Sequence, residues 1–89
     1  MPDVTIYTTG FCPFCFHAKK LLDNKGVGYN EIDVSRVPGA RKEMRQRANG
    51  GQTVPQIFIG DHHVGGCDEL YALEQKKQLD PLLAQDTVG

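Results

Sequence analysis

The fold of this chain is set by residues 3–26, DVTIYTTGFCPFCFHAKKLLDNKG, in which a strand pattern passes directly into a helix pattern. Residues 3–8 alternate apolar and polar side chains and are rich in β-branched residues, which predicts a β-strand. Pro13 suits the first position of a helix, and small or apolar side chains then recur at helical spacing until Gly26. The segment Cys12-Pro13-Phe14-Cys15 therefore lies where a strand ends and a helix begins.

The next part of the chain repeats the same alternation. Residues 29–34 place apolar side chains on one face and predict a second strand, and residues 40–48 predict a second helix that ends at Asn49-Gly50-Gly51. Two strands joined through a helix of this length are expected to be parallel, with a right-handed crossover.

The last third of the chain changes the pattern. Residues 56–59 and 62–64 flank Gly60-Asp61, a two-residue connection typical of tight hairpins, so these two strands are predicted to be antiparallel. A third helix is expected after Gly65-Gly66, and Asp80-Pro81 can cap one short final turn. We therefore predict an α/β fold: a βαβ unit, then a β-hairpin and a helix, giving a mixed four-stranded sheet flanked by helices.

The position of Cys12 predicts thiol chemistry. At the start of a helix its sulfur faces backbone N–H groups without partners and the positive end of the helix dipole, which favour a thiolate. A thiolate is the species that attacks a disulfide, and Cys15, one helical turn further on, can close a disulfide with it. Ligands of such sheets gather beyond the carboxyl ends of the parallel strands, which is where Cys12 lies.

Composition narrows the class of protein. The chain of 89 residues is long enough for one domain, residues 1–89, and its net charge of −1 gives no general attraction to nucleic acid or to anionic lipid. It begins without the basic and apolar segments of a secretory signal, and it contains no apolar run of membrane-spanning length. Three cysteines are an odd, small number for a disulfide-stapled fold, so we expect a cytoplasmic protein that contacts no membrane.

Three separated motifs give the chain a resemblance to glutaredoxins, the glutathione-dependent branch of the thioredoxin fold. They are Cys12-Pro13-Phe14-Cys15 after the first strand, Thr53-Val54-Pro55 before the third strand, and Gly65-Gly66-Cys67-Asp68 before the third helix. A single C-x-x-C motif is a weak signal, because zinc sites and many redox proteins share it. Three motifs in the same order make the signal strong, and the resemblance covers nearly the whole chain. The resemblance implies a thioredoxin-like fold.

The resemblance also implies an activity. It implies a glutathione-dependent oxidoreductase that reduces protein disulfides and glutathione mixed disulfides, with Cys12 as the nucleophile and Cys15 as the resolving thiol. Glutathione would act as reductant and substrate, with no tightly bound cofactor or metal, and a second glutathione can replace Cys15 in releasing the glutathionyl group. The partners it implies are glutathione and disulfide-containing or glutathionylated proteins, and the protein is expected to be a monomer.

The implied glutathione site combines backbone and side chains from all three motifs. In the family Pro55 follows a cis peptide bond, which leaves the backbone N–H and C=O of Val54 available for an extended ligand, as in strand addition. The start of the third helix favours a bound carboxylate, and Asp68 can accept from the ligand's ammonium group or simply cap the helix. The residues implied in glutathione binding are Phe14, Thr53, Val54, Pro55, Gly66, Cys67 and Asp68.

Four further positions bear on this site. Arg47 and Gln52 are additional candidates for binding the glycyl carboxylate of glutathione. The sequence departs from the family at Thr9, where glutaredoxins commonly carry a lysine that helps to bind glutathione and to stabilise the thiolate. Cys67 is expected to contribute mainly backbone, and we assign its thiol no redox step; regulatory oxidation is a minor alternative that expects the thiol to be exposed.

Three other functions compete with this prediction. The first is a zinc module, whose four ligands would be Cys12, Cys15, His17 and one residue among His62, His63 and Cys67. A dimer that shares an iron–sulfur cluster held by Cys12 and glutathione is a second possibility, although Pro13 and the second thiol argue against it. The third is a redoxin reduced by thioredoxin reductase, but this chain lacks the tryptophan usual beside the active site of thioredoxins.

Overall fold

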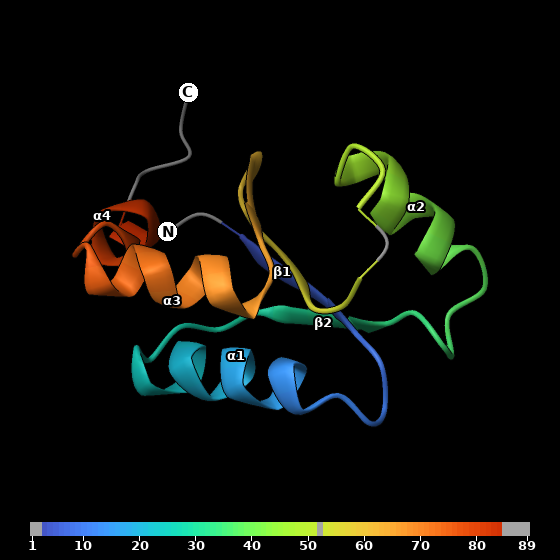
Figure 1. Cartoon of the computed structure of the whole chain (residues 1–89), viewed down its shortest axis with the longest axis horizontal. Helices are drawn as coiled ribbons and strands as arrows, with labels where there is room; N and C mark the ends of the chain where they lie inside the picture. The colour runs from blue at the N-terminus through green and yellow to red at the C-terminus, as the bar shows by residue number, and fades with distance from the viewer. Residues whose placement is uncertain (1–2, 52, 85–89) are drawn as a thin grey trace.

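The computed structural model describes residues 3–51 and 53–84. Strands and helices alternate along the first half of the chain, and a hairpin followed by two helices forms the second half (Figure 1). The elements are β1 (Val4–Thr8), α1 (Pro13–Asn24), β2 (Asn30–Asp33), α2 (Ala40–Arg47), β3 (Gln56–Ile59), β4 (His62–Gly65), α3 (Cys67–Gln75) and α4 (Leu79–Ala84).

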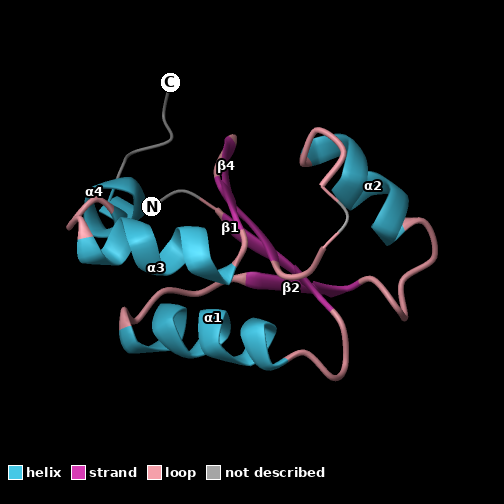
Figure 2. Cartoon of the chain, viewed as in Figure 1, coloured by secondary structure: helices cyan, strands magenta, loops and turns pink. Residues whose placement is uncertain are grey.

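The four strands form one mixed sheet in the order β2-β1-β3-β4 (Figure 2). β1 pairs with β2 in parallel, and β3 is antiparallel to both β1 and β4. The predicted α/β fold with a mixed four-stranded sheet is confirmed. The second strand is shorter than predicted because its ladder with β1 runs only from Asn30 to Asp33, where it meets the end of β1 at Thr8.

Helices cover both faces of the sheet. α1, α3 and α4 pack on one face, where Ile6, Leu22, Ile57 and Leu70 belong to one cluster of buried side chains (Figure 1). α2 lies alone on the opposite face, over a second buried cluster that includes Tyr7, Met44 and Phe58. Successive residues of a strand point to opposite faces, so Ile6 and Tyr7 of β1 serve different clusters.

The hairpin carries a bulge next to the start of α3. Phe58 pairs with His63 but Ile57 pairs with Gly65, so β4 holds one extra residue at this point. Gly65 has a φ of +110°, a conformation that side-chain-bearing residues rarely adopt. Bulges of this kind bend the strand and redirect the chain, which here turns straight into α3.

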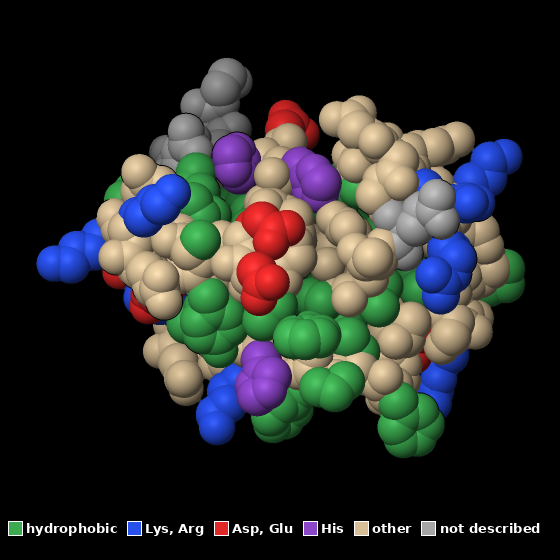
Figure 3. All heavy atoms as spheres, viewed as in Figure 1, with side chains coloured by type: hydrophobic (Ala, Val, Ile, Leu, Met, Phe, Trp, Pro, Cys, Tyr) green, Lys and Arg blue, Asp and Glu red, His purple; other side chains and the backbone are tan. Residues whose placement is uncertain are grey.

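The surface is uneven in charge. Arg41, Lys42 and Arg45 of α2 are exposed, and basic side chains gather over this helix at the right of Figure 3. Acidic side chains lie nearer the centre of the same view, next to a band of hydrophobic ones.

Within residues 3–51 and 53–84, no helix has both the length and the apolar character needed to cross a membrane.

Candidate active site

Cys12 is the N-cap residue of α1. Its backbone is extended, with φ −139° and ψ 103°, and Pro13 follows at the first helical position. Its Sγ accepts a hydrogen bond from the backbone N–H of Cys15 at 3.2 Å. The N–H group and the positive end of the helix dipole both stabilise negative charge on this sulfur. The predicted position of Cys12 at the start of the helix is confirmed.

The second thiol of the motif is in a different environment. The Cys15 side chain is only 1% exposed and packs one turn inside α1. Burial, reinforced by the hydrogen bond with Cys12, raises the pKa of the Cys15 thiol from 9.0 to about 12. All three cysteines are free thiols in this structure. Cys12 is therefore the accessible sulfur of the pair, and Cys15 is a buried, protonated one.

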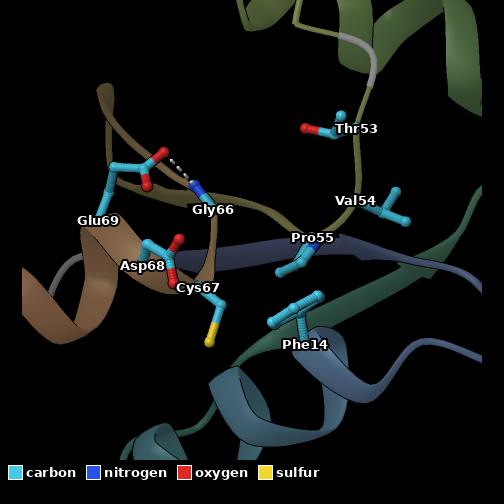
Figure 4. Close-up of a pocket in the computed structure, with 8 residues that line it drawn as sticks. All are labelled: Phe14, Thr53, Val54, Pro55, Gly66, Cys67, Asp68 and Glu69. Carbon is cyan, nitrogen blue, oxygen red and sulfur yellow. Dashed lines mark hydrogen bonds between the residues drawn. The ribbon is translucent and has the colours of Figure 1, made fainter.

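A cavity of about 320 Å³ lies next to Cys12 (Figure 4). Val54 lines this cavity, and its carbonyl oxygen lies 3.8 Å from the Cys12 Sγ, close enough to accept from the thiol form. The cavity is lined by the seven residues that the sequence places in a ligand site, together with one more; they are Phe14, Thr53, Val54, Pro55, Gly66, Cys67, Asp68 and Glu69.

Three separate parts of the chain build this cavity. Thr53, Val54 and Pro55 come from the segment before β3 and form one wall, facing the start of α3 (Figure 4). The Val54-Pro55 peptide bond is cis, as the family resemblance implies. Phe14 projects from the first turn of α1 and lies below Pro55, and its side chain is 60% exposed.

The opposite wall is the first turn of α3. Gly66 is the N-cap residue, and its N–H donates to Oε1 of Glu69 at 3.2 Å (Figure 4). The next N–H groups, those of Cys67 and Asp68, have no acceptor within the helix because they belong to its first turn. This wall therefore offers backbone donors and the positive end of a helix dipole to an anionic group.

Glu69 was not predicted as a cavity residue. The signal is present in the sequence, because a glutamate three residues after an N-cap is one half of a capping box. Here the cap residue is Gly66, which has no side chain for the other half, so the pattern is incomplete. The remaining half still satisfies the N–H of Gly66 at the start of α3.

Cys67 differs from its prediction. Its side chain is 8% exposed and points from α3 toward α1, so the expectation of an exposed thiol was wrong (Figure 4). Burial, together with the charge of Asp68, raises the pKa of the Cys67 thiol. The physical reason is helix periodicity: Cys67 and Leu70 lie three residues apart on the inward face of α3, and both join the main core.

The remaining candidates lie elsewhere. Arg47 does not line the cavity: its Nη1 donates to the Tyr7 hydroxyl at 2.9 Å, and its guanidinium lies 4.2 Å from the centre of the Phe58 ring. Gln52 lies outside the described residues. Thr9 is half-buried in the loop that leads to Cys12.

The zinc alternative requires several ligands close together. Within the described part of the chain, His, Cys, Asp and Glu side chains form no group of three that could hold a metal ion. Cys12 and Cys15 are close, but His17 follows on an exposed face of α1, while Cys15 points into the core. The ligands that this alternative needs are not brought together.

Comparisons with known proteins agree with this geometry. The family model described as "Glutaredoxin" matches residues 4–64. A glutaredoxin of Pseudomonas aeruginosa is 54% identical over 84 residues, which cover 94% of this chain and 99% of that protein. The solution structure of glutaredoxin from Brucella melitensis is 58% identical, with a TM-score of 0.80, and the match covers 93% of this chain and 89% of that one.

A more distant solved structure is a complex with glutathione. The crystal structure of a buckwheat glutaredoxin–glutathione complex is 29% identical, with a TM-score of 0.84, and the match covers 92% of this chain and 76% of that one. The family model spans more than half of the chain, and the bacterial relatives cover nearly all of it. This chain therefore belongs to the glutaredoxin family.

Proposed function

We propose that this protein reduces protein disulfides and glutathione mixed disulfides, with Cys12 as nucleophile and glutathione as the electron donor. The observation that carries the proposal is the position of the Cys12 sulfur. It caps α1, where an N–H group stabilises its charge, and it lies 3.8 Å from the Val54 carbonyl at the edge of the cavity. One sulfur is thus both activated by the helix and placed beside a ligand site.

The first step is attack by the Cys12 thiolate on one sulfur of the substrate disulfide. A bond forms between Cys12 and that sulfur, the substrate S–S bond breaks, and the other sulfur leaves as a thiolate that takes up a proton. With a glutathionylated protein, attack on the glutathione sulfur releases the protein thiol and leaves glutathione disulfide-bonded to Cys12.

The second step returns Cys12 to the thiolate. A second glutathione thiolate attacks the glutathionyl sulfur, which yields oxidised glutathione and frees Cys12. Cys15 can instead attack the Cys12 sulfur of the mixed disulfide, which breaks that disulfide, releases the bound thiol and forms an internal disulfide that two glutathione molecules then reduce to give oxidised glutathione. The Cys15 route requires loss of a proton from a thiol whose pKa is raised by burial, a cause that persists after Cys12 has formed a disulfide, so external glutathione is favoured for glutathionylated substrates.

Glutathione is expected to bind in the cavity with its two ends held differently. The first turn of α3 offers the N–H groups of Cys67 and Asp68 to the γ-glutamyl carboxylate, and the exposed Asp68 carboxylate offers an acceptor to the ammonium group. The backbone of Val54 can pair with the peptide-like middle of the ligand, and Phe14 covers it from below. A glutaredoxin–glutathione complex among the solved relatives supports this assignment.

The proposal is tested with single-cysteine replacements in a coupled assay. Reduction of a glutathionylated peptide is followed with glutathione, glutathione reductase and NADPH. Cys12→Ser should abolish turnover, Cys15→Ser should retain part of it, and Cys67→Ser is the matched control because it replaces the other buried thiol, which has no assigned redox step.

Two results would contradict it. Equal loss in Cys12→Ser and Cys15→Ser would exclude the route through a second glutathione. Turnover of the wild-type protein with thioredoxin reductase in place of glutathione would support the thioredoxin-like alternative instead.

A further inference from the structure

Gln56 is a buried polar residue that joins the cavity wall to the hairpin. It follows Pro55 as the first residue of β3, and its side chain is 5% exposed. Its Oε1 lies 2.7 Å from Nε2 of His63 on β4, and its Nε2 donates to the Thr53 hydroxyl at 3.4 Å. Both ends of the Gln56 amide are therefore bonded, one to the hairpin and the other to a residue of the cavity.

The His63 ring is itself held in place by its neighbours. His63 pairs with Phe58 across the hairpin, and the two rings stack with their centres 4.8 Å apart and their planes 21° apart. Gln56 and Phe58 lie two residues apart on β3 and share one face of the sheet, so His63 reaches Gln56 on that face. The imidazole can then present Nε2 to the amide in one orientation.

The opposite side of Gln56 is closed by the turn after α2. A Cβ atom added at Gly51 would lie 3.1 Å from Nε2 of Gln56 and 3.1 Å from Cβ of Ala48. The amide is thus enclosed between that turn and the hairpin. When Nε2 of His63 carries the proton, this buried amide is costly to rotate, because rotation would turn its NH₂ group toward the N–H of His63.

The direction of the bond between His63 and Gln56 determines which end of the Gln56 amide faces the Thr53 hydroxyl. When the Nε2–H of His63 donates to Oε1 of Gln56, the amide NH₂ is directed at Thr53. Thr53 lines the cavity, and in Figure 4 its hydroxyl points toward the α3 side. The next residue is Val54, whose carbonyl lies 3.8 Å from the Cys12 sulfur. Fixing Thr53 therefore also fixes the peptide group that borders the reacting atom.

We propose that Gln56 and His63 are positioning residues that hold the Thr53–Val54 wall in the geometry that binds glutathione. This inference rests on the proposed function, because it assumes that glutathione occupies this cavity. Neither residue lines the cavity, so their effect reaches the ligand only through Thr53 and Val54. It is therefore an effect on binding rather than on the sulfur chemistry.

The test compares His63→Ala with His62→Ala. Both histidines are exposed and adjacent on β4, but His62 is not bonded to Gln56. His63→Ala should raise the KM for glutathione about three- to tenfold, the range that corresponds to losing one neutral hydrogen bond, with kcat changed less than twofold. His62→Ala should leave both constants unchanged. His63→Gln, which retains an N–H donor, should recover part of the loss.

The amide is tested separately. Gln56→Met removes the amide that Thr53 bonds, because a methionine side chain has no N–H donor, and Thr53→Val removes the hydroxyl. Each should raise the KM for glutathione, and the double variant should be no worse than the more affected single one, because both remove the same bond. Urea unfolding of every variant separates this loss from a loss of folded protein.

Clear outcomes would overturn the inference. It fails if wild-type protein turns over glutathione and His63→Ala has the KM of His62→Ala, or if the effects of Gln56→Met and Thr53→Val simply add. It also fails if kcat falls in parallel with stability, which would indicate a structural role alone. Absence of glutathione turnover in the wild-type protein would instead refute the proposed function.

Discussion

The different environments of the two cysteines predict a measurable difference in reactivity. Burial, helped by the hydrogen bond with Cys12, raises the pKa of Cys15 from 9.0 to about 12. A double variant, Cys12→Ser with Cys67→Ser, leaves Cys15 as the only thiol and retains burial, the larger of these causes. Its reaction with a small aromatic disulfide should therefore be much slower than that of an ordinary thiol.

The size of the effect depends on two opposing factors. In the wild-type protein the rise in pKa from 9.0 to about 12 lowers the thiolate fraction at pH 7 about a thousandfold, which is an upper limit for the variant because it lacks the contribution of Cys12. The remaining thiolate is more nucleophilic, by roughly 16- to 32-fold for a Brønsted coefficient of 0.4–0.5, so the net loss through the thiolate fraction is at most about 30- to 60-fold. Limited access to a side chain that is 1% exposed can only add to it.

The raised pKa of Cys15 also determines how its reaction rate changes with pH. A thiol whose pKa is raised stays neutral through neutral pH, so the rate of Cys15 should rise about tenfold per pH unit from pH 7 to 10 without a plateau. The same variant unfolded in urea is the matched control, and its rate should level off above about pH 9. A plateau at the same pH in the folded protein, or equal rates in both forms at pH 7, would refute the role of burial.

Three further predictions concern stability and the cavity. Tyr7→Phe removes a buried hydroxyl bonded to two charged partners on α2, and urea unfolding should show a loss of about 1–3 kcal/mol. Leu22→Ala empties a fully buried site and should cost about 2–5 kcal/mol in the same assay; a loss below about 1 kcal/mol would contradict close packing there. Gly65→Ala adds a Cβ 2.8 Å from Oε1 of Glu69 at a φ of +110°, so it should lower the urea midpoint and raise the KM for glutathione. Gly28→Ala, with nothing within 4 Å, is its control and should change neither quantity.

Most of the fold could be predicted because its signals are local. The start of α1 is indicated by Pro13 and the helical spacing that follows it, and the β3–β4 hairpin by Gly60-Asp61 between two short strand-like runs. The parallel pairing of β1 and β2 is predicted by the length of the helix between them. Each of these features depends on residues close in sequence, so no knowledge of distant contacts was needed.

The parts of the site that could not be predicted depend on contacts between distant residues. Arg47 was assigned to a ligand from its charge, but the structure places it against Tyr7, 40 positions away, and over the Phe58 ring. The bond between His63 and Gln56 crosses from β4 to β3, next to a bulge that shifts the register of the hairpin by one residue. Neither arrangement leaves a pattern in the local sequence. The burial of Cys67 is different, because its three-residue spacing from Leu70 was readable.

The spacing of the two cysteines also determines which of them reacts first. A side chain at the N-cap lies outside the helix and accepts an N–H bond from the residue three positions on, and here that residue is the other cysteine. Cys15 therefore stabilises charge on the Cys12 sulfur through its backbone, while its own side chain is turned into the core and held neutral. For Cys15 to react first, its side chain would have to leave the core. The positions of the two cysteines in the first turn of α1 therefore determine that Cys12 reacts first. A substrate that meets this surface reaches Cys12 first, and Cys15 can act only after Cys12 has been converted into a disulfide.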